Sequence, residues 1–215
     1  MLIFGHRGSP GRFPENTLPS FEEALRAGVD GFETDLRLLA DGAAVLYHDD
    51  ELGGVDVESQ TWSGAAAKGT ALPRVSDLAP FAGKTTMILE VKRGGWEERL
   101  VEEIAGWPGI LVTSFDHTLI AALHRRNVPF PLGIVYCGRI AGAGAYARSV
   151  GATWACPGDR YVGRDVVSEL HDHGVQVVPW TANRKRDWER LREAGCDGVI
   201  TDLPAEAVAW RRGLT

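Results

Sequence analysis

The sequence predicts a parallel (β/α)8 barrel, an α/β fold, and two observations lead to this prediction. Short apolar runs of strand length alternate with amphipathic stretches along the chain, and eight of each can be counted. Several helix ends also place a glycine where the chain must turn into the next strand, as in Ala27-Gly28-Val29. Apolar strands separated by helices are typical of a parallel sheet buried on both faces, and eight such units close into a barrel.

The expected strands are rich in apolar residues and cover 2–5, 31–36, 87–91, 110–113, 132–136, 153–155, 175–179 and 198–201. The expected helices carry apolar residues at helical spacing and cover 19–27, 75–81, 96–105, 117–126, 141–150, 163–173, 184–194 and 205–212. A doubly wound sheet is the alternative, but it requires a glycine-rich phosphate loop after the first strand. His6-Arg7-Gly8-Ser9-Pro10 stands there instead, which favours the barrel.

Two stretches depart from the alternation. Asp41-Gly42 lies between two apolar runs and has the signature of a tight reversal, so we expect a hairpin after the second strand. Residues 49–73 are rich in Gly, Ala, Ser and Thr and show little periodicity. We expect a short insertion loop there, which is either a lid on the substrate side or a disordered surface loop.

Composition narrows the class of protein. The 215 residues, 44% of them hydrophobic, can form one large domain, and we expect a single catalytic domain over residues 1–215. A formal net charge of −6 argues against nucleic acid or an anionic membrane as a general partner. Three dispersed cysteines, no long apolar span and no signal-peptide pattern at the N-terminus predict a cytoplasmic protein.

Acidic side chains stand at the carboxyl ends of two predicted strands, where barrel enzymes carry their working groups. Glu33 and Asp35 point to the same face because they are two residues apart, and Glu90 ends the next strand. Three carboxylates in so small a space repel one another unless a cation lies between them. Oxygen ligands select a hard ion, so we expect one divalent cation, Mg²⁺ or Ca²⁺, with Mn²⁺ also compatible.

Two histidines and two basic residues surround this acidic cluster. His6 ends the first strand and His48 follows the hairpin, so they are candidates for a general base and a general acid acting at phosphorus. Arg7 offers a fork for two phosphate oxygens, and Lys92 offers a point charge. With a divalent cation and one phosphodiester present, the formal charges of the cluster cancel.

An ordered set of motifs carries a resemblance to a known family. These are His6-Arg7-Gly8, Pro14-Glu15-Asn16-Thr17, Glu33-x-Asp35, His48-Asp49, Glu90-x-Lys92, Trp180-Thr181-x-Asn183 and Thr201-Asp202-x-Pro204. In that order they resemble the glycerophosphodiester phosphodiesterase family over nearly the whole chain. The pattern is also similar, more distantly, to the phosphatidylinositol-specific phospholipases C.

The resemblance implies a barrel that hydrolyses glycerophosphodiesters to glycerol 3-phosphate and an alcohol with Mg²⁺ or Ca²⁺. It implies Glu33, Asp35 and Glu90 as metal ligands, His6 and His48 as the acid–base pair, and Arg7 and Lys92 as phosphate contacts. Asn16 and Trp180 are then substrate-binding residues. Residue chemistry alone suggests instead that Glu15 and Asn16 are turn and helix-cap residues, and that Trp180 is a packed tryptophan.

The chain departs from the family after His48-Asp49, where family members usually carry an Arg-Thr-Thr segment and a longer helical insertion. Here Glu51-Leu52-Gly53-Gly54-Val55 follows, which predicts a more open site and leaves the alcohol specificity undetermined. Activity on lysolipids of the lysophospholipase D type, or formation of a lasting cyclic phosphate, is therefore an alternative. A barrel that binds a phosphorylated ligand without catalysis is another.

Overall fold

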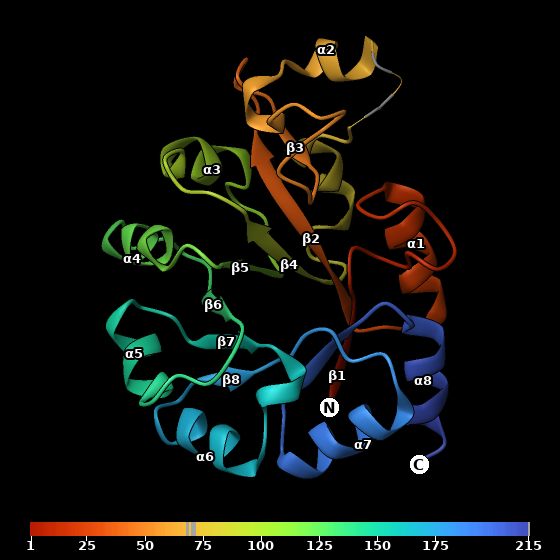
Figure 1. Cartoon of the computed structure of the whole chain (residues 1–215), viewed down its shortest axis with the longest axis vertical. Helices are drawn as coiled ribbons and strands as arrows, with labels where there is room; N and C mark the ends of the chain where they lie inside the picture. The colour runs from red at the N-terminus through yellow and green to blue at the C-terminus, as the bar shows by residue number, and fades with distance from the viewer. Residues whose placement is uncertain (68, 70–71, 215) are drawn as a thin grey trace.

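A computed structural model describes residues 1–67, 69 and 72–214, and in this part of the chain eight parallel strands form the predicted barrel (Figure 1). They follow the order β8, β7, β6, β5, β4, β2, β1, β9 around the sheet. Hydrogen bonds from Asp197 N to Val177 O and from Ile200 N to Pro179 O join the two ends of this order. The strands are β1 (Leu2–Gly5), β2 (Gly31–Leu38), β4 (Thr86–Val91), β5 (Ile110–Ser114), β6 (Leu132–Tyr136), β7 (Trp154–Pro157), β8 (Gln176–Val177) and β9 (Gly198–Thr201).

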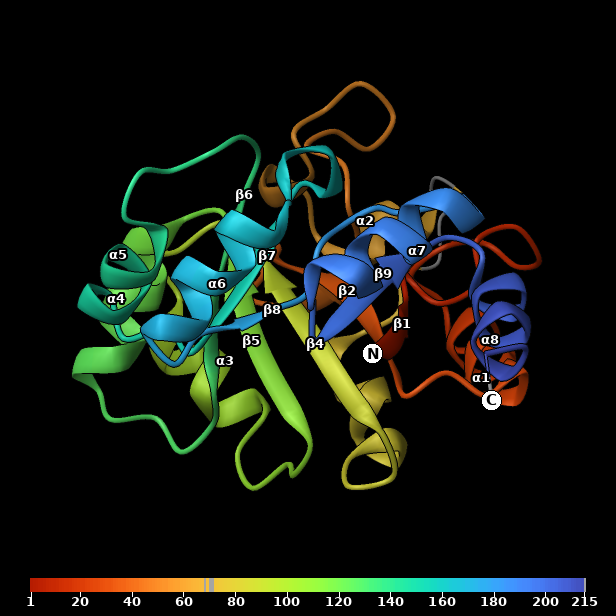
Figure 2. The same ribbon diagram turned by 90° about the horizontal axis from the view of Figure 1, so that it is seen from below.

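Helices cover the outside of the barrel, as Figure 2 shows, and bury apolar faces against the strands. They are α1 (Leu18–Ala27), α3 (Glu97–Glu103), α4 (His117–Arg125), α5 (Ala143–Ser149), α6 (Arg164–Asp172), α7 (Lys185–Ala194) and α8 (Pro204–Arg212). The turn from α1 into β2 uses Gly28, whose φ of 96° is the left-handed value expected from the sequence. Within the described residues no helix combines the length and the apolar character that a membrane crossing needs.

Alternation along the strands divides apolar side chains between two layers. Residues that point outward, such as Ile3, Phe32 and Leu89, pack against the helices. Residues that point inward form a separate cluster that fills the barrel, composed of Phe4, Ile88, Leu111, Val135, Cys156, Val178 and Ile200. This plug supports the next inward positions toward the carboxyl ends of the strands, where polar side chains replace apolar ones.

The expected hairpin is present, since β3 (Ala44–Leu46) pairs antiparallel with the end of β2. The prediction of an irregular loop over 49–73 was only partly right. Within its described residues lie a short 3-10 helix, η1 (Val57–Ser59), and the helix α2 (Trp62–Ala67). Both pack on a small apolar cluster with the hairpin, formed by Leu39, Val45, Leu52, Val57, Ala65 and Leu72. Lys68, Thr70 and Ala71 lie outside the described residues.

Two predicted elements differ from the structure for identifiable reasons. The stretch Val75–Phe81, predicted as an amphipathic helix, is a 3-10 helix, η2. Pro80 lies inside it and cannot donate the backbone hydrogen bond that an α-helix needs there. The strand predicted over 175–179 is regular only over β8, because Pro179 has no N–H to continue the ladder. Val178 N–H still donates to the Ala155 carbonyl, and the Pro179 carbonyl still accepts from Ile200. The other boundaries differ from the predicted ones by at most two residues.

Candidate active site

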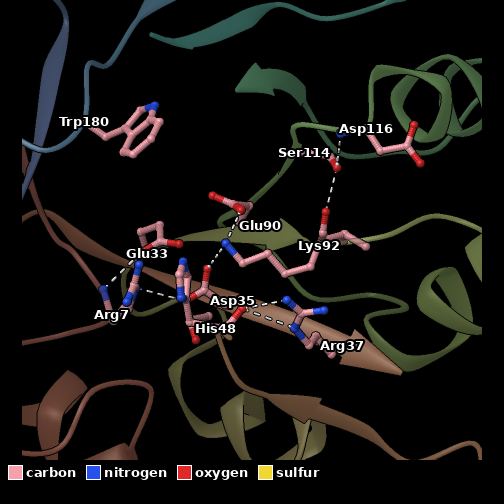
Figure 3. Close-up of polar contacts among 12 residues, drawn as sticks. Arg7, Glu33, Asp35, Arg37, His48, Glu90, Lys92, Ser114, Asp116 and Trp180 are labelled. Carbon is pink, nitrogen blue, oxygen red and sulfur yellow. Dashed lines mark hydrogen bonds and ion pairs between the residues drawn. The ribbon is translucent and has the colours of Figure 1, made fainter. Parts of the chain in front are cut away.

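The three carboxylates meet at the carboxyl ends of β2 and β4 (Figure 3). The parallel register sets Asp35 opposite Glu90, and alternation puts Glu33 on the same inner face. One oxygen from each carboxylate lies within 4.8 Å of the other two. Glu33 and Asp35 are only 3% and 1% exposed. The sequence therefore brings three acidic groups together in a place that water reaches poorly.

The electrostatics of this cluster fit a cation. Burial, together with repulsion from Asp35 and Glu90, raises the pKa of Glu33 well above its usual range. Its Oε1 atom is buried and finds no hydrogen-bond partner among the described residues. Burying a carboxylate oxygen without a partner costs folding free energy. A hard divalent ion is the cation that this set of oxygen ligands binds best. Glu33, Asp35 and Glu90 can thus hold a metal ion.

Two basic groups partly neutralise the acids. Lys92 Nζ lies 2.7 Å from Asp35 Oδ1 and also contacts Glu90 Oε1. Burial by itself would raise the pKa of Asp35, but the charges of Lys92 and Arg7 outweigh it and lower that pKa. Burial would lower the pKa of Lys92, and its contacts with Asp35 and Glu90 outweigh this and raise it. Lys92 is therefore a protonated group at the edge of the metal-ligand set.

A tight turn after β1 orients Arg7. Arg7 and Gly8 have φ values of 51° and 89°, both left-handed. A Cβ on Gly8 would lie 2.5 Å from Ser20 Oγ, so only glycine lets this turn pack against α1. The Arg7 backbone N–H donates to Glu33 Oε2 at 3.1 Å, and its Nη1 donates to both carboxylate oxygens of Glu15 at 3.0 Å. Arg7 Nε lies 3.1 Å from Asp35 Oδ2.

Asn16 supports Asp35, and its interpretation as a helix cap was wrong. Thr17 is the N-cap residue of α1. Asn16 is 3% exposed with a left-handed φ of 55°, and its Nδ2 donates to Asp35 Oδ2 at 2.8 Å. Its Oδ1 accepts hydrogen bonds from the Thr34 hydroxyl and from the Asp35 backbone N–H. The side chain that the resemblance implies for substrate therefore lies against Asp35.

His6 is held by a carboxylate that sequence reasoning did not assign a role. His6 Nδ1 lies 2.6 Å from Asp202 Oδ1, and its Nε2 lies 3.9 Å from Glu33 Oε2. Asn183 fixes Asp202, since its Nδ2 donates to Asp202 Oδ2 and its Oδ1 accepts the Asp202 backbone N–H. The bond to Asp202 directs Nε2 toward the acids. Glu90 was selected because working groups lie at the carboxyl ends of barrel strands. Asp202 follows β9 and Asn183 follows β8, so the same rule could have selected them.

His48 is held through its backbone by Arg37, another residue that the sequence analysis missed. Arg37 continues the inward series of Glu33 and Asp35 and is 3% exposed. Its Nε and Nη2 donate to the His48 carbonyl at 3.3 and 2.7 Å (Figure 3). It also binds Asp50 Oδ1 at 2.7 Å and Glu58 Oε1 at 3.0 Å. His48 Nδ1 contacts Asp49, which leaves Nε2 available to a substrate.

Trp180 forms part of an aromatic wall at the barrel mouth. Its ring packs edge-on against Phe115 with centroids 5.5 Å apart, and its Nε1 donates to the Cys156 carbonyl at 2.9 Å. Seven of the predicted site residues line a single cavity there: His6, Arg7, Glu33, His48, Glu90, Lys92 and Trp180. Asp35 and Asn16 lie directly behind them.

Comparison with known proteins relates nearly the whole chain to one family. The family model described as "Glycerophosphoryl diester phosphodiesterase family" matches residues 6–79 and 84–206. A glycerophosphodiester phosphodiesterase of Bacillus altitudinis is 29% identical, with 99% of this chain and 98% of that protein covered. One from Caldanaerobacter subterraneus is 28% identical, with 94% of each covered.

Solved structures share the fold. A phosphodiesterase of Oleispira antarctica, crystallised with the product sn-glycerol-3-phosphate, superposes with a TM-score of 0.87 at 21% identity, covering 99% of this chain and 97% of that chain. The glycerophosphodiester phosphodiesterase of Thermotoga maritima gives a TM-score of 0.85 at 22% identity, with 97% of each chain covered. The barrel prediction is confirmed by the strand order and by these superpositions.

Proposed function

The chain belongs to the glycerophosphoryl diester phosphodiesterase family, and from this premise we propose that it hydrolyses glycerophosphodiesters to glycerol 3-phosphate and an alcohol with a divalent cation and two histidines. The observation that carries the proposal is the convergence of three carboxylates within 4.8 Å in a cavity that His6 and His48 also line. A phosphodiester centred there meets acidic, basic and imidazole groups at once.

Glu33, Asp35 and Glu90 would hold the cation, which is Mg²⁺ or Ca²⁺, with Mn²⁺ compatible. When bound, such an ion supplies Lewis-acid stabilisation of a non-bridging phosphate oxygen. The buried Oε1 of Glu33 supports this assignment, because among the side chains around it no donor reaches that atom. Asn16 keeps Asp35 in place through two atoms of its amide, and so acts on the ligand set as well as bordering the substrate.

Arg7 and Lys92 would contact the substrate phosphate. Arg7 Nη1 is paired with Glu15, and Nη2 has no protein partner among the described residues. Lys92 bridges Asp35 and Glu90. Its three protons suffice for both carboxylates and one phosphate oxygen. Trp180 and Phe115 would border the alcohol.

His6 is the proposed base and His48 the proposed acid. The Asp202 carboxylate accepts a hydrogen bond from His6 Nδ1–H, so Nε2 carries the lone pair that takes a proton from the attacking oxygen. That oxygen belongs either to water or to the glycerol hydroxyl next to the ester, which gives a cyclic phosphate first. His48 Nε2 then donates a proton to the departing alcohol oxygen, and Arg37 fixes the backbone that carries this ring.

The test is hydrolysis by the pure protein of glycerophosphocholine, glycerophosphoethanolamine and lysophosphatidylcholine, each with Mg²⁺, Ca²⁺ or a chelator. We expect release of glycerol 3-phosphate from the two glycerophosphodiesters only when a cation is present, whereas cleavage of the lysolipid would give lysophosphatidate and choline. Phosphorus NMR distinguishes direct release from a transient cyclic phosphate. A lasting cyclic product, or turnover of the lysolipid alone, would favour the alternative activities, and no turnover of any diester with any metal would contradict the proposal.

Two alanine variants, His6→Ala and His48→Ala, test the proposed acid–base pair. Positioned acid–base groups typically contribute about 10²- to 10⁴-fold, so each variant should lose activity of this order and keep its thermal midpoint within a few degrees. Parent-like turnover by either variant would remove that histidine from the mechanism.

A further inference from the structure

A second cavity of about 590 Å³ lies beside the catalytic pocket, and arginines dominate its lining. It is bounded by the segment after β7 and by the first turns of α7. Its charged lining residues are Arg160, Arg184, Arg186, Arg190, Asp159 and Asp187. Four guanidinium groups against two carboxylates make this a basic site in a chain whose formal net charge is −6.

The protein itself neutralises only part of this charge. Arg190 donates to the carbonyls of Val162 and Asp159 and lies 3.3 Å from Asp159 Oδ2. Arg186 Nε lies 4.0 Å from Asp187 Oδ1. Arg160 and Arg184 are exposed, and their side chains form no hydrogen bond or ion pair with the described residues, although the Arg184 carbonyl accepts the backbone N–H groups of Asp187 and Trp188. Two guanidinium groups therefore remain available to a ligand that enters the cavity.

The start of α7 adds to the positive potential. Arg184 is the N-cap residue of this ten-residue helix, and its side chain makes no capping hydrogen bond. The N–H groups of a first helical turn have no partner within the helix, and together with the helix dipole they favour an anion. Arg184 and Arg186, which line the cavity, lie at this end of α7. The arginine side chains and the backbone N–H groups thus both favour an anion.

A third cavity shares lining residues with both the arginine cavity and the catalytic pocket. Asp159, Arg160 and Thr181 also line a cavity of about 280 Å³ whose wall includes Trp180. Trp180 in turn lines the catalytic pocket with Glu90 and His48. A hydrogen bond of 2.7 Å from Asp159 N to the Trp180 carbonyl joins the two segments. The catalytic pocket, the smaller cavity and the arginine cavity therefore share lining residues in series, and Trp180 stands between the first two.

We infer that the arginine cavity, defined by Arg160, Arg184, Arg186 and Arg190, is a subsite for the alcohol portion of glycerophosphodiesters whose alcohol carries a second anionic group, a phosphate monoester or a carboxylate. This inference rests on the proposed function and names the substrate class. A diester bound with its phosphorus at the carboxylates extends its alcohol past Trp180, and an anionic end then meets Arg160 and Arg184. A cationic alcohol such as choline gains no favourable electrostatic contact with these arginines.

The test compares matched substrates with R160Q/R184Q, which removes the two unpaired charges from exposed positions. Glycerophosphoinositol 4-phosphate against glycerophosphoinositol tests the phosphate, and glycerophosphoserine against glycerophosphoethanolamine tests the carboxylate. We expect the parent to prefer at least one anionic member, and the variant to lose about tenfold or more in kcat/KM for that member only. R125Q/R148Q, which removes two exposed arginines of α4 and α5, is the charge-matched control and should behave as the parent.

A binding measurement tests the subsite independently of the proposed hydrolysis. Calorimetry with inositol 4-phosphate or phosphoserine alone, in chelator, measures the subsite without catalysis. Binding to the parent that is lost in R160Q/R184Q would support the subsite even if no diester were hydrolysed. Equal kinetic losses on both members of each pair, or unchanged preference and binding in the variant, would overturn it while leaving hydrolysis intact.

Discussion

Nδ1 of His6 lies 2.6 Å from Oδ1 of Asp202, and 196 positions of sequence separate the two residues. The contact joins the end of the first barrel strand to the end of the last, where β1 and β9 pair. Closure of the barrel therefore fixes the orientation of the proposed base. Asp202 is a positioning residue, because it acts on the reaction through His6.

Replacing Asp202 with Asn should impair turnover and leave substrate binding nearly intact. The amide can present an N–H to Nδ1, which moves the imidazole proton to Nε2 and removes the lone pair that accepts a proton. We expect kcat to fall by about 10²-fold or more with KM within a factor of two or three. Steady-state kinetics check this, with the exposed Asp172→Asn as control. A parent-like kcat would exclude the positioning role.

The same carboxylate should contribute to acid sensitivity. Burial by itself would raise the pKa of Asp202, but its hydrogen bond from His6 and the nearby charges outweigh burial and lower that pKa. A lowered folded-state pKa stabilises the protein above the ordinary aspartate value, about 3.9, and this contribution disappears as pH falls toward the folded-state pKa. The difference in unfolding free energy between the parent and Asp202→Asn should therefore be larger at pH 6 than at pH 3. Urea titrations at the two pH values measure it, and equal differences would contradict the assignment.

Replacing Glu33 with Gln should separate metal binding from folding. Gln keeps an oxygen for the Arg7 backbone N–H and removes a buried charge whose Oε1 has no partner. In chelator the variant should melt at or above the parent temperature. Mg²⁺ or Ca²⁺ at 100 times its Kd should stabilise the parent by about 2.7 kcal/mol and leave the variant unchanged. Glu22→Gln on α1, an exposed position, serves as control. A parent-like cation shift in Glu33→Gln would remove Glu33 from the ligand set.

Arg37→Met should disturb the segment that carries His48. It leaves the His48 carbonyl, Asp50 and Glu58 without their buried donor, and we expect a loss of about 1–3 kcal/mol in unfolding free energy and at least tenfold in kcat. Arg93→Gln removes the exposed contact to the same Glu58 and should cost little. Denaturant titrations and steady-state kinetics on both variants measure these changes in unfolding free energy and kcat. Unchanged kcat in Arg37→Met would show that the His48 backbone needs no such anchor.

The fold and the acidic cluster could be predicted from the sequence because both depend on local patterns. Alternation along each strand places Glu33, Asp35 and Glu90 on the inner face, and the parallel register then makes them meet. Pro80 could also have predicted that η2 is not an α-helix, but the helical spacing of the apolar residues around it was given more weight. These features depend on periodicity and on residue type alone.

The remaining contacts depend on tertiary structure. Asn16 reaches Asp35 because its backbone adopts a left-handed conformation, which the residue type permits but does not require. The apolar cluster around α2 draws Leu39 and Val45 from the hairpin and Leu72 from beyond the helix, so no single window shows its period. Arg37 has the appearance of a surface charge until three acceptors are found around it.

The helix α2 and Val45 of the hairpin pack on an apolar cluster of their own, apart from the cluster inside the barrel. Ala44 and Leu46 of the hairpin belong instead to the core between the strands and the outer helices. A change confined to α2 and its cluster therefore leaves the main core filled, whereas truncation of Ala44 or Leu46 would open a cavity in that core. Within this condition the segment after the hairpin is free to vary in length and composition. Arg37 sets the limit of that freedom, because a redesigned excursion must still return a carbonyl to the guanidinium if His48 is to keep its place.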